Sequence, residues 1–245
     1  MQSCVSEEPA NDALAAAAGH YWRQSAVRPW VADMSHWRGR WSDDAAWSGI
    51  GAAHVTMFRQ LCALAARQTP VTSMLEWGPG GGANALAFAP LVKRMYGIDI
   101  SPPNLGECGR QLASNGFNDW NPIEIDANVP EDALQKLDSP VDFLLCTAVI
   151  QHFPSQDYGR RVLKIFNRAL ANEGLALIQT RYDDGSEVLR CKTNDYEKNV
   201  VTFTSYRIDA FWHDLIQAGF EPLSIILRPE SCYAYYLTKK GAGRE

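Results

Sequence analysis

The chain has 245 residues, of which 46% are hydrophobic and 21% are charged, a globular composition that excludes a disordered or fibrous protein. Its formal net charge of -5 counts against a protein whose main task is to neutralise phosphate backbones, so nucleic acid is not an expected partner. The first 20 residues lack a basic start and a long apolar run, so we expect neither a signal peptide nor a membrane span.

The cysteines and acidic residues show no pattern typical of a metal site or of a disulfide framework. None of the cysteines forms a C-x-x-C pair, and several lie inside apolar runs. They are Cys4, Cys62, Cys108, Cys146, Cys191 and Cys232. This pattern predicts reduced thiols in a cytoplasmic protein and metal-independent chemistry.

The first 70 residues differ from the rest in their tryptophan content. Five of the eight tryptophans lie before position 50, namely Trp22, Trp30, Trp37, Trp41 and Trp47. Ser42, Asp43 and Asp44 then begin a predicted helix of about 24 residues. We expect residues 1–70 to form a helical cap, which either closes over an apolar substrate as a lid or packs statically on the rest of the chain.

Residues 71–245 alternate short apolar runs with helical patterns, the order expected of an α/β sheet with helices on both faces. The pattern predicts strands at 71–76, 95–100, 123–126, 141–149 and 174–179, and helices at 83–89, 101–115 and 131–137 and after Ser155. A polar stretch at 183–199 is long enough to be a lid or a binding loop. A helix at 208–218 and two strands at 221–227 and 233–238 follow, and their short link predicts an antiparallel hairpin.

The glycine-rich stretch EWGPGGGAN, Glu76 to Asn84, is compatible with two ligands. As G-x-G-x-x-A it is a dinucleotide fingerprint, and as E-x-G-x-G-x-G it suggests S-adenosylmethionine. Both sites need glycine where the ligand approaches the backbone, and both use an acid such as Asp99 at the end of the second strand. The glycines alone therefore leave an NAD-dependent oxidoreductase open.

Three features favour S-adenosylmethionine. The Glu76 carboxylate would repel a pyrophosphate, whereas it can attract an ammonium and a sulfonium. Asp126, after the third strand, is placed to accept a hydrogen bond from an adenine amino group. The terminal hairpin leaves no second domain for a nicotinamide substrate. Tyr235 and Lys239 have the spacing of a dehydrogenase pair, but they lie in a predicted strand, where four residues span roughly 13 Å.

Four ordered segments resemble the motifs of class I S-adenosylmethionine-dependent methyltransferases: 75–82, 98–101, 125–127 and 172–178. The resemblance covers roughly residues 71–240 and implies a Rossmann-like, doubly wound seven-stranded sheet, mostly parallel, with an antiparallel end. It also implies that residues 71–245 form the cofactor-binding domain. The implied contacts are Glu76, Gly78, Pro79, Gly80 and Gly82 to the methionine half, Asp99 and Ile100 to the ribose, Asp126 and Ala127 to the adenine, and Thr147 beside them.

His152 is the predicted general base. It follows the fourth strand at the carboxyl edge of the sheet, where ligands of open α/β sheets gather, and histidine has a suitable unperturbed pKa. The alternative is that His152 only fixes the turn or packs under the cofactor. His36 and His54 are weaker candidates, and His20 and His213 are expected on the surface.

The predicted substrate contacts come from the cap and from the loop after the fifth strand. They are Trp37, Arg38 and Trp41 in the cap, and Arg181 and Tyr182 in the loop. The cap arginines suggest an anionic acceptor, although arginines often lie over aromatic rings without binding a ligand. No Asn-Pro-Pro-Tyr-like sequence follows the fourth strand, which favours a small-molecule acceptor of the natural-product or sugar type.

The leading hypothesis is therefore S-adenosylmethionine-dependent methylation of a small molecule, most simply at oxygen with His152 assisting. Three alternatives remain: methylation at nitrogen, where a neutral amine needs no strong base, an NAD-dependent oxidoreductase, and a non-catalytic binding module on the same fold. The sequence specifies neither the acceptor nor an oligomeric state.

Overall fold

The computed structural model describes residues 8–40 and 43–242. Within them, one seven-stranded sheet has the order β3-β2-β1-β4-β5-β7-β6. Neighbouring strands are parallel, except that β7 runs antiparallel to both β5 and β6. This topology confirms the predicted fold class. The strands are β1 Ser73–Trp77, β2 Arg94–Asp99, β3 Trp120–Glu124, β4 Val141–Cys146, β5 Leu170–Arg181, β6 Phe220–Arg228 and β7 Tyr233–Lys240.

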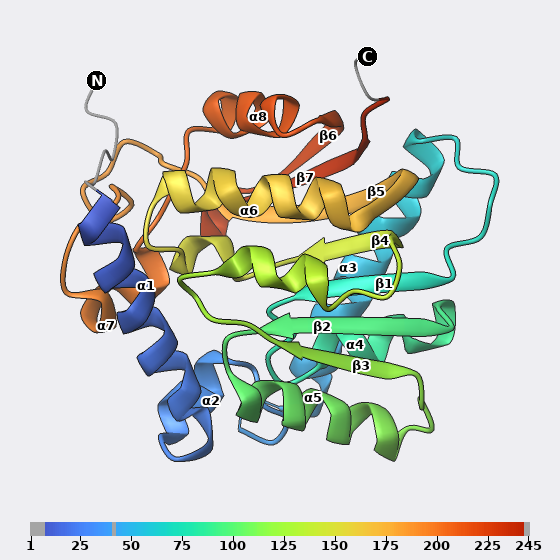
Figure 1. Cartoon of the computed structure of the whole chain (residues 1–245), viewed down its shortest axis with the longest axis horizontal. Coiled ribbons are helices and arrows are strands. Elements are labelled where there is room, and N and C mark those ends of the chain that lie inside the picture. The colour runs from blue at the N-terminus through green and yellow to red at the C-terminus, as the bar shows by residue number, and fades with distance from the viewer. Residues whose placement is uncertain (1–7, 41–42, 243–245) are drawn as a thin grey trace.

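Helices cover both faces of the sheet (Figure 1). They are α1 Glu8–Trp22, α2 Pro29–Met34, α3 Asp44–Leu64, α4 Ala83–Phe88, α5 Pro102–Ser114, α6 Gln156–Ala169, α7 Tyr196–Asn199 and α8 Ile208–Gln217. α6 and α8 pack against one face through residues such as Phe166 and Phe211. α3, α4 and α5 pack against the other through residues such as Phe58, Phe88 and Leu112. The sheet therefore has a hydrophobic core on each side.

The predicted cap at Ser155 is confirmed, and two helix and strand boundaries differ from the prediction. Ser155 Oγ accepts a hydrogen bond from Tyr158 N at 3.1 Å, as expected of the residue that begins α6. α3 ends at Leu64, before the predicted Gln68, and Ala66 just beyond it has a left-handed φ of 49°. The strand predicted at 141–149 ends at Cys146, because Ala148 has a left-handed φ of 58° that a strand cannot continue through.

The cap predicted at residues 1–70 contains two differently placed parts. α3 contributes to the core of the sheet. α1 and α2 instead gather with α7 at the carboxyl ends of the parallel strands (Figure 1). These helices share a third apolar cluster that includes Trp22, Val31, Tyr196 and Phe203. Segments from opposite ends of the sequence thus meet above the strand ends, where ligands of such sheets bind.

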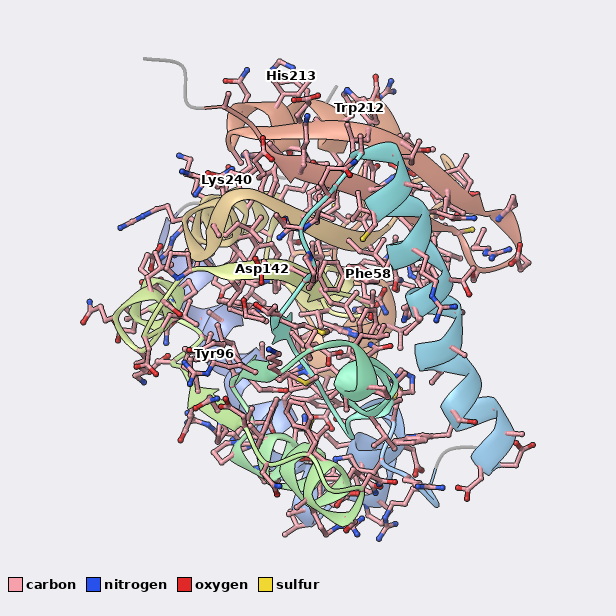
Figure 2. All side chains as sticks on the ribbon, turned by 90° about the vertical axis from the view of Figure 1, so that its right-hand side faces the viewer. Phe58, Tyr96, Asp142, Trp212, His213 and Lys240 are labelled. Atoms are coloured by element: carbon pink, nitrogen blue, oxygen red, sulfur yellow. The ribbon has the colours of Figure 1, made fainter. Side chains whose placement is uncertain are left out.

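The amino-terminal ends of the parallel strands face the viewer in Figure 2. There, Asp142 accepts hydrogen bonds from several neighbouring groups. Asp142 Oδ1 accepts a hydrogen bond from Arg67 Nη2 at 3.0 Å. Asp142 Oδ2 accepts from the backbone nitrogens of Thr72 at 2.8 Å and Ser73 at 3.1 Å. The carboxylate thereby joins the start of β4 to the segment that leads from α3 into β1. These contacts stabilise the fold at the amino-terminal ends of the strands. The ligand site is expected at the carboxyl ends.

Candidate functional site

A cavity lies at the carboxyl ends of the parallel strands, beneath α1 and α7. It contains about 1020 Å³ of non-atom space, including the part that opens to solvent. Its walls come from the loop after β1, the ends of β2 and β4, and the cap. They include Ala18, Trp22, Trp77, Gly78, Pro79, Gly80, Asp99, Ile100, Ala127, Thr147, Ala148, His152 and Tyr196. Apolar walls with a few polar groups are typical of small-ligand sites.

The glycine loop approaches its neighbours too closely for other residues. Gly78 has a φ of 74°, and a Cβ there would lie 2.3 Å from Val149 Cγ2. Gly80 has a φ of 52°, and its Cβ would lie 2.5 Å from the carbonyl oxygen of Ser35. Gly82 begins α4 with a φ of 87° but does not line the cavity. Backbone conformation and close protein neighbours therefore require glycine at positions 78 and 80, both of which line the cavity.

Glu76 is the buried acid at the end of β1, with 1% of its surface exposed. Its Oε1 accepts a hydrogen bond from Asn84 Nδ2 at 2.8 Å, whereas Oε2 has no partner among the described residues. Burial raises the pKa of Glu76 to about 8. A buried, half-satisfied carboxyl is costly unless a ligand supplies a cation or a hydrogen-bond donor.

Asn84 connects Glu76 to His54, a contact that the sequence reasoning missed. The Asn84 Nδ2 that faces Glu76 also donates to Thr147 Oγ1 at 3.1 Å. Asn84 Oδ1 lies 2.7 Å from His54 Nδ1, and an amide oxygen only accepts. His54 therefore carries its proton on Nδ1, and its Nε2 is left as an acceptor. His54 is buried and lines the cavity, and burial lowers its pKa.

The ends of β2 and β3 supply the part of the site predicted for ribose and adenine. Asp99 lines the cavity, its Oδ1 accepts a hydrogen bond from Ser101 N at 2.9 Å, and burial raises its pKa to about 7. Ile100 and Ala127 form an adjacent apolar wall. Asp126 is exposed and lies outside this wall, because its Oδ1 accepts from Asn128 N at 2.8 Å within a tight turn.

His152 lines the cavity beyond the end of β4. Its Nδ1 lies 2.5 Å from the carbonyl oxygen of Val200. Because a carbonyl only accepts, Nδ1 donates, and the lone pair of Nε2 faces the Gln151 amide nitrogen at 3.5 Å. The ring packs against Trp22 with 4.8 Å between centroids. Burial lowers the pKa of His152 to about 4, so the imidazole is neutral at physiological pH.

Two further aromatic residues close the cavity and were not among the predicted site residues. Trp22 Nε1 donates a hydrogen bond to the Tyr196 hydroxyl at 3.1 Å. That hydroxyl donates in turn to the carbonyl oxygen of His152 at 2.7 Å. Trp22 and Tyr196 are separated by 174 positions, so only the abundance of tryptophan in the cap could have drawn attention to this contact.

The predicted substrate residues lie outside the cavity wall among the described residues. Trp37 Nε1 donates to Asn104 Oδ1 at 2.9 Å. Arg38 is exposed, pairs with Asp44 at 3.1 Å and lies over the ring of Trp47. Trp41 falls outside the described residues.

Arg181 and Tyr182, the predicted substrate residues after the fifth strand, are half-buried at the end of β5. The Arg181 guanidinium packs over Tyr233 with 4.7 Å to the ring centroid. Tyr182 forms an isolated bridge with Tyr206.

Other classes of site were searched for in the part of the chain that the structure describes. There, no group of three or more His, Cys, Asp or Glu side chains is placed to hold a metal ion. In that part, Cys62, Cys108, Cys146 and Cys232 are free thiols. Among the helices of residues 8–40 and 43–242, none combines the length and the apolar character needed to cross a membrane.

The site fits S-adenosylmethionine in charge and in shape. Glu76 is not itself among the residues that line the cavity, but its unpartnered Oε2 would suit the cofactor's ammonium group, and Gly78 and Gly80 in the wall would take the methionine half. Asp99 lies where ribose hydroxyls can donate to its carboxylate, and the wall of Ile100 and Ala127 suits a flat apolar ring.

Comparison with known proteins agrees with this geometry. A family model described as a methyltransferase domain matches residues 52–225. Among solved structures, an S-adenosylmethionine-dependent methyltransferase from Clostridium acetobutylicum has a TM-score of 0.60 and 14% identity, over 82% of this chain and 93% of that one. The N-methyltransferase NodS from Bradyrhizobium japonicum, in complex with S-adenosyl-L-homocysteine, has a TM-score of 0.56 and 15% identity, over 76% and 85%.

An rRNA methylase from Streptococcus thermophilus has a TM-score of 0.50 and 15% identity, over 75% of this chain and 95% of that one. A search of curated proteins found no match. At these identities the solved structures establish the fold, and the family model, which spans more than half of the chain, establishes the family. The chain belongs to the methyltransferase family and is a class I S-adenosylmethionine-dependent methyltransferase.

Proposed function

We propose that this enzyme methylates an oxygen atom of a small molecule and that His152 Nε2 accepts the proton of the acceptor hydroxyl. The observation that carries the proposal is the state of His152. Its ring lines the cavity, its Nδ1 is committed to Val200, and its pKa of about 4 leaves Nε2 unprotonated. A lone pair at this position is what an alcohol or phenol acceptor requires.

A weak base is sufficient for this reaction. When bound, S-adenosylmethionine supplies an electrophilic methyl group. An acceptor oxygen that took this methyl group would gain positive charge, and its proton would become strongly acidic. His152 Nε2 can therefore take the proton late in the transfer. The low pKa also keeps His152 from being protonated beforehand, which a pKa near the solution pH would allow.

The cap and α7 support a small acceptor rather than a nucleic acid. Trp22 and Tyr196 enclose the cavity, and enclosure excludes water and aligns reactants. The arginines of the cap are also largely neutralised: Arg23 pairs with Glu124, Arg28 with Glu197 and Arg38 with Asp44. Paired cations and a net charge of -5 do not provide the basic surface that binds a phosphate backbone.

A His152→Ala variant tests the proposal. Hydroxylated and aminated small molecules are first screened with wild-type enzyme by release of S-adenosylhomocysteine. For a hydroxyl acceptor, we expect the kcat of His152→Ala to fall about a hundredfold or more, because general-base catalysis supplies about that much. Affinity for S-adenosylhomocysteine should stay within about twofold. His213→Ala removes an exposed histidine and serves as the matched control.

The second candidate is a nitrogen acceptor, favoured by the structural similarity to an N-methyltransferase. A neutral amine attacks through its own lone pair, so the same variant separates the candidates. A loss of kcat below about tenfold, with the cofactor still bound, would remove His152 from the role of base and support methylation at nitrogen.

A further inference from the structure

Beyond His152, at the ends of β5 and β7, four side chains form a donor cluster: Gln151, Gln179, Arg181 and Tyr233. We infer that this cluster binds a carboxylate of the acceptor, so that the enzyme methylates acidic small molecules. The inference rests on the proposed small-molecule function and specifies its substrate class.

Arg181 is the cation of the donor cluster, and its charge is uncompensated. Nη1 donates to the carbonyl oxygen of Ser231 at 3.1 Å, and Nη2 donates to the Tyr233 hydroxyl at 3.0 Å. Nε is buried and has no partner among the described residues. The ion pairs of the described chain all use other cations. A half-buried guanidinium whose neighbours are neutral is a natural partner for an anion.

Gln179 and Tyr233 also have hydrogens to donate, whereas the Gln151 amide nitrogen already faces Tyr233 and His152. Gln179 is 2% exposed; its Oε1 accepts from Ala148 N at 2.9 Å, and its Nε2 has no partner among the described residues. The Tyr233 hydroxyl accepts from Arg181 and, at 3.4 Å, from Gln151 Nε2. Its own proton is therefore left to donate. Buried donors are normally paired, so this excess indicates a missing acceptor.

The donor cluster adjoins the cavity on the side of His152. Gln179 holds the backbone of Ala148, and both Ala148 and His152 line the cavity. Gln151 Nε2 lies 3.5 Å from His152 Nε2. In the sheet, Arg181 is paired with Tyr233. None of the four side chains is part of the cavity wall itself, so the cluster lies behind the His152 side of that wall, and the inference requires the acceptor's acidic group to reach past it.

The composition of the donor cluster favours a carboxylate over a phosphate. It holds one cation, and its remaining donors are amides and a phenol. A singly charged, planar group with two oxygens matches a guanidinium edge and an amide. A phosphate dianion would be left with an unbalanced charge in a half-buried site.

Matched pairs of acids and amides test the inference by titration calorimetry. The probes are 3-hydroxybenzoate and 4-hydroxybenzoate, each compared with its hydroxybenzamide, on protein saturated with S-adenosylhomocysteine. Aromatic probes suit walls that include Trp22, Phe153 and Tyr158. The variants are Arg181→Gln and the milder Tyr233→Phe, which keeps the ring, with Arg207→Gln as an exposed control paired to Asp209.

For the wild type, we expect at least one acid to bind about tenfold or more tightly than its amide. Arg181→Gln should abolish that preference, Tyr233→Phe should reduce it severalfold, and Arg207→Gln should keep it. The inference is overturned if no acid is preferred in either pair, including the case where neither member binds, or if both cluster variants keep the full preference. If the wild-type protein does not bind S-adenosylhomocysteine at all, that result would instead contradict the function proposed above.

Discussion

Glu76 shows how a single residue can indicate a ligand. Its position at the end of β1 gives the charge that a cationic cofactor needs. The structure adds that one of its oxygens is buried without a partner and that Asn84 connects the other to His54. Glu76 and His54 are thereby joined through the Asn84 amide, whose orientation fixes the tautomer of His54.

Cofactor binding should release a proton from Glu76. The pKa of the buried carboxyl is about 8 in the free enzyme, so near pH 6.5 it is mostly protonated. A bound ammonium group favours the ionised form, so we expect about one proton to leave per S-adenosylhomocysteine bound. Calorimetry in phosphate and in Tris, which differ in ionisation enthalpy, measures this number. In Glu76→Gln, the proton that Glu76 releases on binding should be absent, and any proton that Asp99 releases should remain. Equal binding enthalpies for the wild type in both buffers would contradict the expectation.

Residues on the sheet were easier to predict than residues in loops. Glu76 and Asp99 lie at the carboxyl ends of β1 and β2, His152 lies beyond the end of β4, and the topology alone brings such positions together. Asp126 and Arg38 were assigned to the site from charge and position, but local hydrogen bonds turn them elsewhere. The direction of a loop side chain depends on such contacts, which a strand or helix pattern does not contain.

At the scale of elements, the apolar runs predicted each strand, because a buried parallel sheet needs them. The closure of the cavity could not be predicted in the same way. α1 and α7 come into contact only in the folded chain, and the sequence of neither helix indicates that it packs against the other. α1 and α2 pack with α7 over the carboxyl ends of the strands, whereas α3 packs on the sheet, and whether the cap closes as a lid stays a prediction.

Tyr196→Phe should loosen the contact between α1 and α7. The change removes the hydrogen bonds to Trp22 and to the His152 carbonyl, each worth about 1 kcal/mol, and keeps the ring. We expect kcat/KM for the acceptor to fall about threefold to thirtyfold and hydrogen exchange of α7 to rise, while cofactor affinity stays within about twofold. Tyr236→Phe, whose hydroxyl donates to Ile208, is the matched control. Unchanged exchange in α7 would show that these bonds do not hold it closed.

At the scale of the whole molecule, the cofactor site lowers the stability of the fold. Two acids, Glu76 and Asp99, are buried at neighbouring strand ends, and burial raises the pKa of each. The acid at the amino-terminal ends of the strands is in a different environment, because Asp142 receives hydrogen bonds from Arg67, Thr72 and Ser73. Glu76, with an unpartnered oxygen, thus lies at the carboxyl end of a strand, whereas Asp142, with several hydrogen-bond donors, lies where the strands begin.

This asymmetry predicts how the stability of the free enzyme depends on pH. The folded-state pKa of Glu76, about 8, exceeds its usual 4.5. The contribution of protonated Glu76 to the free energy of unfolding is therefore complete below pH 4.5 and is lost as the pH rises through 8. Between pH 6 and 8 the wild type should lose about 2 kcal/mol relative to Glu76→Gln, or ~4–8 °C in Tm. Binding of S-adenosylhomocysteine should restore most of the stability that the wild type loses. Thermal unfolding of both proteins across this range measures the difference, and parallel curves without ligand would show that Glu76 is not a buried, protonated acid.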